Sequence, residues 1–528
     1  MKHKAPLAKG YSEAGASMTR RALRAFIPDS GSPNEDIIRN NETLRKRSRL
    51  LYMSSPAATS GINTNRTKVV GVGLALKTAI NREVLGLSAE QAKAWQRRTE
   101  AEWRLWAERP RNCDAIGLSS FAELQQLALK SWLMSGDCFA LIKYADPTPM
   151  NPYGMRLHLI EADRVATPGE YRDALFGMNA GTIPEGKPGA GHRIYDGVEV
   201  DNDGCVTAYH IASGYLHESV DKIKWTRVLA FGEKTGFPNV LHIMDAERPD
   251  QYRGVPYLAQ IIEPLLQTRR YTDAELMAAL VQSFFTAWIE TETDPMSIPM
   301  NEVGAGDQTT SDGVDIENPR DNISDSENEY EMGPGTVLHL QPGEKVNFGN
   351  PNIPTAGFEP FMKTLLRTMG AALELPYDVL VKEYNSSYSS ARAAIQDAWE
   401  GFRMRRAWLT ADFCRPVYER WLAEAVARGR IKAPGFFDDP LLREAWCGAR
   451  WIGPAQGVLD PLKEARANLL LISHGIKTHA QVTTEMTGGD WEENVEQLQR
   501  EIELLKEAGV EPMSAMVTNL GGGDGEGE

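Results

Sequence analysis

Residues 253–288 read RGVPYLAQIIEPLLQTRRYTDAELMAALVQSFFTAW. Apolar side chains recur at helical spacing from Leu258 to Trp288, which predicts one long helix. Pro256 suits the first turn of that helix, where a backbone N–H lacks a helical partner in any case. Pro264 lies farther along and predicts a kink.

A strongly acidic segment follows this helix. Residues 290–331 hold thirteen Asp and Glu against one Arg, a net charge of −12, whereas the whole chain carries −15. A second helix is predicted from Gly357 to Leu375, and residues 384–390 after it read YNSSYSS. This order is typical of a helical hairpin that lines a passage for a negatively charged molecule.

The composition indicates a globular protein with more than one domain. The chain has 528 residues, of which 42% are hydrophobic and 24% charged. It has no run of about 18 apolar residues, so neither a transmembrane helix nor a membrane partner is expected. The five cysteines are scattered without metal-ligand or redox spacing, which favours free thiols in a reducing cytoplasm.

The charge is unevenly distributed. Residues 1–49 hold eleven Lys and Arg against five Asp and Glu. Residues 1–50 are therefore interpreted as a flexible basic arm, either a solvated tail or an arm that docks on a partner subunit, with a short helix from Asp36 to Met53. An acidic chain is not expected to bind nucleic acid tightly, because phosphate binding depends on Lys and Arg. It suits a protein past which nucleic acid slides.

Helices and strands are mixed along the rest of the chain, so the expected fold class is α+β. Helices are predicted at 88–107, where Ser88 and Gln91 form a capping box, and at 120–134. Strands are predicted at 67–76, 138–144, 156–160, 198–200, 206–211 and 224–230.

The C-terminal part is predicted to be helical. A long helix is expected from Ser389 to about Leu422, bent near its end by Pro416. Three shorter helices are expected after Asp460, Thr478 and Asp490, each of which suits a helix N-terminus.

The sequence contains no recognisable catalytic motif. The nine His residues form neither His-Glu-x-x-His nor a zinc spacing with Cys, and there is no Gly-x-Ser-x-Gly. The carboxylates of residues 307–317 are wrongly spaced for a calcium loop. We therefore expect no enzyme activity, no metal and no cofactor. The alternative is a metal-dependent nuclease or processing enzyme that uses the acidic segment, although such a site needs carboxylates on rigid strands.

Seven short patterns occur in a fixed order along the chain. They are Val69-Val70-Gly71-x-Gly73, Trp103-x-x-Trp106, Asp114-x-x-Gly117-x-x-x-Phe121 before Gly136-Asp137, Arg253-Gly254-Val255-Pro256, Asn385-Ser386-Ser387-Tyr388-Ser389-Ser390-Ala391-Arg392, Asp460-Pro461-x-Lys463-Glu464 and Gly475-x-x-Thr478. Each is weak alone, but together they run from Val69 to Thr478. The likeness that they carry extends over about residues 35–505. In these patterns the chain resembles the lambda-type family of tailed-bacteriophage portal proteins.

The resemblance implies a portal fold, with a mixed α/β wing, a two-helix stem, a small α/β clip and an α-helical crown, assembled as a ring that normally has twelve subunits. It implies the following division: arm 1–50, wing 51–254, first stem helix 255–292, clip 293–350, second stem helix 351–376, channel loop and long wing helix 377–455, crown 456–510 and disordered tail 511–528. The clip is expected to include strands at 336–340 and 345–348. Residues 301–333 are interpreted as an acidic, disordered insertion.

The resemblance also implies a function. The ring would form a channel at one capsid vertex of the virion, through which double-stranded DNA is packaged and ejected. Its partners would be the major capsid protein, the packaging terminase and a head–tail adaptor, after assembly in the host cytoplasm. A head–tail adaptor without a channel is a further alternative, although adaptors are usually much shorter.

The resemblance further implies which residues face DNA. The channel loop would present Asn385, Ser386, Ser387, Tyr388, Ser389 and Ser390. Neutral hydroxyl and amide groups suit that position, because they contact DNA without releasing counterions. Tyr388 would either touch DNA or pack on its own helix. Arg392, Arg403 and Arg406 would lie at subunit interfaces or on DNA, with ion pairs inside one subunit as the alternative.

Overall fold

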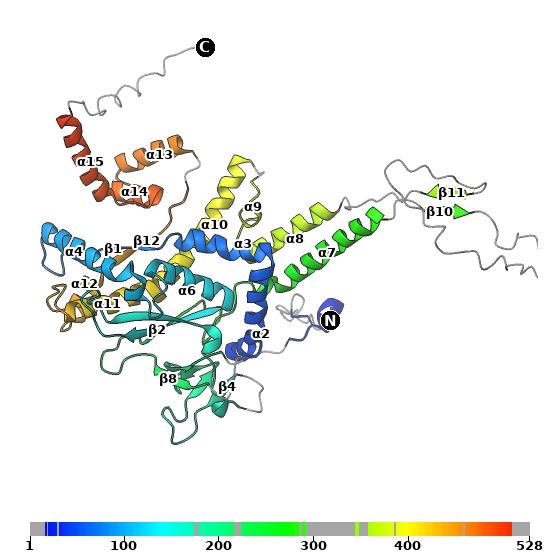
Figure 1. The fold of residues 1–528 in the computed structure, drawn as a ribbon, viewed down its shortest axis with the longest axis horizontal. Helices are drawn as coiled ribbons and strands as arrows, with labels where there is room; N and C mark the ends of the chain where they lie inside the picture. The colour runs from blue at the N-terminus through cyan, green and yellow to red at the C-terminus, as the bar shows by residue number, and fades with distance from the viewer. Residues whose placement is uncertain are drawn as a thin grey trace, which may run out of the picture. The chain divides into compact units, whose positions relative to one another are not determined.

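The computed structural model describes residues 16–17, 20–28, 31–173, 179–215, 223–284, 288–291, 344–347, 357–384, 387–457 and 460–508. They separate into two units, one formed by residues 1–265 with 365–528 and the other by residues 266–364. Helices and strands are mixed along the chain, which confirms the α+β class (Figure 1). The predicted strand 336–340, the insertion 301–333 and the tail 511–528 lie outside the described residues.

The N-terminal helices belong to the first unit. After α1 (Arg21–Arg24), α2 (Pro33–Ser54) starts at a capping box, in which Ser32 and Glu35 each bind the other's backbone N–H. Six residues of α2 are buried, and the helix packs against α3 (Pro56–Asn65) and α6 (Phe121–Ser135). The helix is longer than the predicted 36–53. From residue 33 onward the chain is therefore part of the packed body, whereas the sequence suggested an arm up to residue 50.

The strand predicted at 67–76 is wrong in its first half. Arg66–Val70 form a π-helical turn that continues α3, and Gly71 ends it with a φ of 60°. Val69 and Val70 are completely buried on this turn. These two valines, which suggested a strand in the sequence, therefore pack into the core from a helical turn. β1 (Ala75–Thr78) follows and pairs antiparallel with β12 (Ala449–Ile452).

Two antiparallel sheets form most of the β-structure. β2 (Asp137–Tyr144) lies between β3 (Met155–Glu161) and β9 (Val240–Met244), and α6 packs on this sheet. The five-stranded sheet has the order β4 (Ala180–Thr182), β5 (Arg193–Tyr195), β6 (Val198–Val200), β7 (Val206–Ala212) and β8 (Trp225–Leu229). The five strands predicted between residues 138 and 230 are confirmed to within one residue at each end.

An aromatic core centres on Trp103, which lies on α4 (Ala89–Ala107) after the predicted Ser88–Gln91 capping box. The Trp103 ring centroid lies between 4.9 and 6.0 Å from those of Trp106, Phe121, Tyr418, Trp421 and Trp451. α5 (Pro110–Cys113) and α12 (Pro440–Cys447) complete the helices around this core. Residues from both sequence segments of the first unit therefore share one interior.

The long C-terminal helix is interrupted once. α10 (Tyr388–Leu409) continues as a π-helical turn (Thr410–Cys414) and then as α11 (Arg415–Ala427). Pro416 has no N–H to donate to Asp412 four residues earlier, and its ring would clash with that carbonyl in a regular helix. The sequence predicted a bend at Pro416. The structure has a π-helical turn, Thr410–Cys414, that ends two residues before this proline.

The first predicted stem helix is shorter than expected. A 3₁₀ turn (Ala259–Ile261) precedes α7 (Ile262–Phe284), and Trp288 belongs to β10 (Trp288–Thr291) instead of the helix. Pro264 lies in the first turn of α7, where a missing N–H removes no helical hydrogen bond, so the predicted kink is wrong.

The second unit contains a small sheet and a pair of helical segments. β10 pairs antiparallel with β11 (Glu344–Asn347), which confirms the strand predicted at 345–348 to within one residue. The second helix, predicted at 357–375, is α8 (Phe358–Ala372). Within the unit the Tyr271 ring of α7 stacks on Phe358 with centroids 5.4 Å apart and meets Phe361 edge-on at 5.2 Å.

The last helices are α9 (Tyr377–Val381), α13 (Pro461–Ser473), α14 (His479–Thr487) and α15 (Trp491–Glu507). Asp460, Thr478 and Asp490 cap the last three, as predicted. Among the described residues, no helix combines the length and apolar character needed to cross a membrane.

Candidate nucleic-acid interface

The Ser-rich segment that was expected to face DNA leads directly into α10. Asn385 and Ser386 lie outside the described residues. Ser387 is the N-cap of α10: its Oγ accepts a hydrogen bond from the Ser390 N–H at 3.4 Å. Tyr388, Ser389 and Ser390 therefore form the first helical turn. The helix start predicted at Ser389 is confirmed to within one residue, whereas the resemblance placed all three residues in the channel loop.

The segment before Ser387 is fixed to the first unit through α9. The Ser60 hydroxyl donates to the Leu380 carbonyl at 2.6 Å, and the Leu380 side chain is buried. Glu374 and Lys382, on either side of α9, have left-handed backbone conformations with φ of 53° and 62°. Such conformations are uncommon for residues other than glycine and need surrounding contacts to hold them.

Arg405 provides such a contact for Glu374. Its guanidinium lies 2.7 Å from the Glu374 carboxylate and 5.0 Å from the centre of the Tyr257 ring. The Tyr257 hydroxyl in turn donates to the Leu373 carbonyl. Arg405 is almost fully buried, so this arginine of α10 positions the turn before α9.

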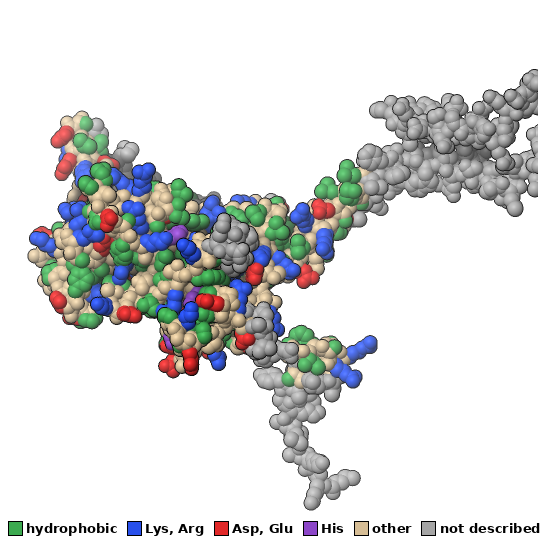
Figure 2. Space-filling model, turned by 60° about the horizontal axis from the view of Figure 1, so that its bottom comes forward, with side chains coloured by type: hydrophobic (Ala, Val, Ile, Leu, Met, Phe, Trp, Pro, Cys, Tyr) green, Lys and Arg blue, Asp and Glu red, His purple; other side chains and the backbone are tan. Residues whose placement is uncertain are grey.

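The side chains that this region exposes are nearly neutral as a group. Ser387, Ser389 and Ser390 are exposed, and residues 377–384 with 387–392 contain two acidic and two basic side chains. On the face drawn in Figure 2, the described Lys and Arg residues are scattered among acidic and apolar side chains. The described residues around Ser387 therefore offer hydrogen-bonding groups without a concentration of positive charge.

The three candidate arginines of α10 have different environments. Arg406 donates to the carbonyls of Val69 at 2.8 Å, Lys68 at 2.8 Å and Pro454 at 3.0 Å. Burial lowers the pKa of Arg406, and the nearby Arg403 lowers it further. Arg406 therefore connects the π-helical turn after α3 to the segment after β12 within one chain.

Arg392 and Arg403 remain accessible. Both line a pocket of about 260 Å³ together with Glu464, Lys477 and Glu485. The Arg392 guanidinium lies 3.9 Å from the Glu464 carboxylate, and half of its side chain is exposed. Of the three arginines, these two have the surface position that an interface or DNA contact requires.

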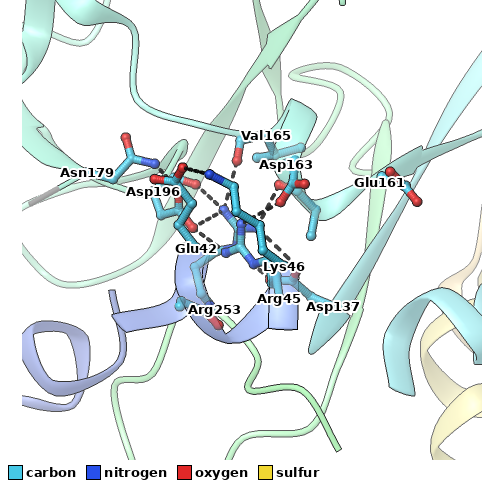
Figure 3. Close-up of polar contacts among 12 residues, drawn as sticks. Glu42, Arg45, Lys46, Asp137, Glu161, Asp163, Val165, Asn179, Asp196 and Arg253 are labelled. Atoms are coloured by element: carbon cyan, nitrogen blue, oxygen red, sulfur yellow. Dashed lines mark hydrogen bonds and ion pairs between the residues drawn. The ribbon is translucent and has the colours of Figure 1, made fainter. Parts of the chain in front are cut away.

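A buried ion-pair cluster, which the sequence did not reveal, positions the start of α7. It consists of Arg45, Asp137, Asp163, Asp196 and Arg253 (Figure 3). Arg253 contacts Asp137 at 2.5 Å and Asp196 at 2.7 Å, and donates to the carbonyls of Val165 and Ala162, both at 2.9 Å. Arg45 of α2 contacts Asp196 and lies 3.5 Å from Asp163.

The cluster brings together two of the sequence patterns. Gly136-Asp137 contacts Arg253-Gly254, and a Cβ on Gly254 would lie 1.9 Å from the Gly136 carbonyl oxygen, so no larger residue fits there. Burial alone would raise the pKa of Asp137, but Arg253, His242 and Arg45 hold it below its ordinary value. These patterns therefore fix the segment before α7 to the three-stranded sheet.

The arrangement offers no evidence for metal chemistry in the described residues. Within them, no group of three or more His, Cys, Asp or Glu side chains is placed to hold a metal ion. The acidic segment on which the nuclease alternative depends lies outside the described residues.

Three known proteins align with this chain over most of its length. The solved neck of a native gene transfer agent particle, computed with C12 symmetry, aligns with a TM-score of 0.42 and 12% identity over 85% of this chain and 94% of that one. Portal protein B of Escherichia phage lambda is 24% identical over 508 residues, which cover 95% of this chain and 91% of that protein. The portal protein of Escherichia phage N15 is 24% identical over 515 residues, or 95% and 92% of the two chains.

The description "Phage portal protein, lambda family" belongs to a family model that matches residues 19–406, well over half of the sequence. The matched residues include the buried ion-pair cluster, α7, α8 and the Ser387-capped start of α10. The chain belongs to the lambda family of phage portal proteins.

Proposed function

We propose that this chain is the repeating subunit of a portal ring, through which the double-stranded DNA of a tailed phage is packaged and ejected. The observation that carries the proposal is the family match over residues 19–406. The alignment with the lambda and N15 portal proteins over 95% of this chain supports it. A twelve-subunit ring at one capsid vertex is the assembly that this role requires.

The proposed subdivision assigns each part of the ring to a range of the chain. Residues 51–254 are the wing, α7 and α8 the stem helices, 293–350 the clip and 456–510 the crown. The burial of Arg253 and Gly254 against the three-stranded sheet supports a defined attachment point for the segment that leads into the first stem helix. This attachment point would be the same in every copy of the ring.

The DNA-facing surface in this proposal is the turn at the start of α10. Ser387, Ser389 and Ser390 are exposed there, and Asn385 and Ser386 precede them in the sequence. Ring symmetry would repeat these neutral groups in every subunit and surround the DNA without a ring of cations, which would retain phosphate. The terminase and the head–tail adaptor are proposed to dock on the clip, and the major capsid protein on the outside of the ring.

Negative-stain electron microscopy of the purified chain tests the proposal. We expect rings with a central hole. Particles that remain monomeric or lack a central hole, at concentrations up to the solubility limit, would reject the portal role. A DNA-cleavage assay with Mg²⁺ distinguishes the portal role from the nuclease alternative. Cleavage that disappears when EDTA is added would support the nuclease.

A further inference from the structure

The three C-terminal helices expose much of their apolar surface. α13, α14 and α15 contain no buried residue, although the structure describes all of them. Leu462, Leu469, Ile476, Leu498 and Leu504 are 63%, 63%, 68%, 54% and 63% exposed. Helices of this length gain most of their stability from burying an apolar face, so these helices need a partner surface.

Contacts with the rest of the chain are polar. Lys93 lies 2.9 Å from Glu492 and 3.2 Å from Glu496, and Lys77 lies 2.7 Å from Asp490. Ion pairs between exposed side chains, such as Lys93 with Glu492, contribute about 0–1 kcal/mol each. These ion pairs attach α15 to α4 and β1, but Leu498 and Leu504 remain more than half exposed.

Two rows of apolar residues have the same spacing. Leu462, Leu469 and Ile476 are seven residues apart on α13 and just beyond its end, and Trp491, Leu498 and Leu505 are seven apart on α15. A seven-residue repeat places side chains on one face of a helix, which is the pattern of helices that pack side by side. The Trp491 ring already stacks on His479 of α14, with centroids 5.5 Å apart, so Leu498 and Leu505 are the open part of the second row.

The two rows carry opposite charges at their centres. Arg466 lies between Leu462 and Leu469 on the same face of α13, four residues after one and three before the other. Glu501 lies between Leu498 and Leu505 on the same face of α15, three residues after one and four before the other. α15 carries six Glu against one Arg and one Lys, so two copies of α15 would repel each other, whereas α13 holds two basic residues and one Glu.

We infer that the α13 row of one subunit packs against the α15 row of the neighbouring subunit, with Arg466 opposite Glu501. Each copy offers both halves of this contact on different surfaces, so the contact is head-to-tail and can close into a ring. The inference rests on the proposed ring and adds which helices join neighbours at its C-terminal end.

Cysteine cross-linking tests which helices meet. A protein with Leu469→Cys and Leu498→Cys, in a background in which the exposed Cys205 is replaced by serine, is oxidised mildly after ring assembly. We expect a ladder of covalent multimers on a denaturing gel, and no ladder from either protein that carries only one of the two introduced cysteines. Rings in the microscope without a ladder overturn the inference but leave the proposed function intact. If the wild-type chain forms no ring, both fall.

A charge exchange provides the second test. Arg466→Glu and Glu501→Arg should each raise, by roughly tenfold, the protein concentration below which rings dissociate. The double exchange should return this concentration to the wild-type value. Arg104→Glu, on an exposed position of α4, is the matched control and should leave that concentration unchanged. Two single exchanges without effect, or a double exchange that is additive instead of compensating, would show that another surface covers these helices.

Discussion

Arg253 and Asp137 lie 116 residues apart in the sequence, and both side chains are fully buried. Replacement of Arg253 by Met would leave the Asp137 charge without its main partner in the interior. We expect this change to lower the free energy of unfolding by about 3–5 kcal/mol. The measurement is the denaturant midpoint of the full chain.

Arg248→Met is the control for that measurement, because the Arg248–Asp36 pair is about half exposed and should contribute less than about 1 kcal/mol. Equal midpoints for the Arg253 and Arg248 variants would mean that the buried ion-pair cluster does not hold the structure together. Asp137→Asn combined with Arg253→Met should cost less than the two single changes added, since neither partner is then left as an unpaired charge.

Asp412 provides a pH-dependent prediction. Burial, and then the charge of Asp245, raise the pKa of Asp412 from 3.8 to about 6. The folded protein therefore retains a proton that the unfolded chain releases, and stability falls as the pH rises from about 4 to about 6. Asp412→Asn removes the cost of ionising this buried carboxyl. The change should therefore raise the melting temperature by about 1–3 °C near pH 7, with no gain near pH 4.

Thermal unfolding at the two pH values measures this difference. Asp438→Asn, at an exposed aspartate, is the control and should have no effect at either pH. A gain of the same size at both pH values would contradict the assignment, because it would reflect packing and not titration.

Residue identity alone could not predict the buried ion-pair cluster. The arginine and glycine before α7 were recognised as a pattern, but their partners come from α2, β2 and the turn before β6, and nothing near Arg253 in the sequence indicates them. The sequence likewise could not separate Arg406, which binds three carbonyls, from Arg392 and Arg403 on the same helix. Long-range partners decide the role of a charged residue.

At the scale of elements, local signals were reliable where a cap or an alternating pattern was complete. Ser88, Thr478 and Asp490 cap the helices predicted after them, and the predicted strands of both sheets are present. Predictions failed where tertiary contacts override local preference. Valine is common in strands, so Val69 and Val70 suggested a strand. In the structure both side chains are buried in the core on a π-helical turn.

The start of α10 provides a functional prediction at this scale. Ser389→Lys adds one cation per subunit to the proposed DNA-facing turn, and in a ring these cations would together retain phosphate. Ser389 is a cleaner position than Ser387, because Ser387 caps the helix and its loss would cost about 0.5–2 kcal/mol. We expect intact rings and at least about a tenfold loss of packaged DNA, partly restored by higher salt.

Nuclease-protected DNA in assembled heads is the measurement, and Ser389→Asn is the neutral control. Normal DNA content in Ser389→Lys heads would show that this turn does not face DNA in the channel. Loss of rings in the same variant, by contrast, would assign the turn to subunit contact.

At the scale of the whole molecule, the sequence and the structure account for different parts of a portal subunit. The fold of the first unit follows from two sheets, an aromatic core and the buried ion-pair cluster, and these are properties of one chain. Among the described residues of one chain, nothing covers the open apolar rows of α13 and α15. In the proposed ring, a neighbouring subunit would supply the surface that they lack.

The acidic segment gives the last prediction, which concerns assembly. Removal of residues 301–333 deletes ten acidic residues and one Arg, and it leaves residues 292–300 and 334–343 to connect β10 with β11. A shorter connection lowers the entropy cost of pairing these strands, by about 0.6 kcal/mol for each halving of length. It also removes repulsion between copies at low salt. We expect the deletion variant to form rings of wild-type mass on native mass spectrometry, and at lower salt than the wild type; monomers alone would show that the segment holds subunits together.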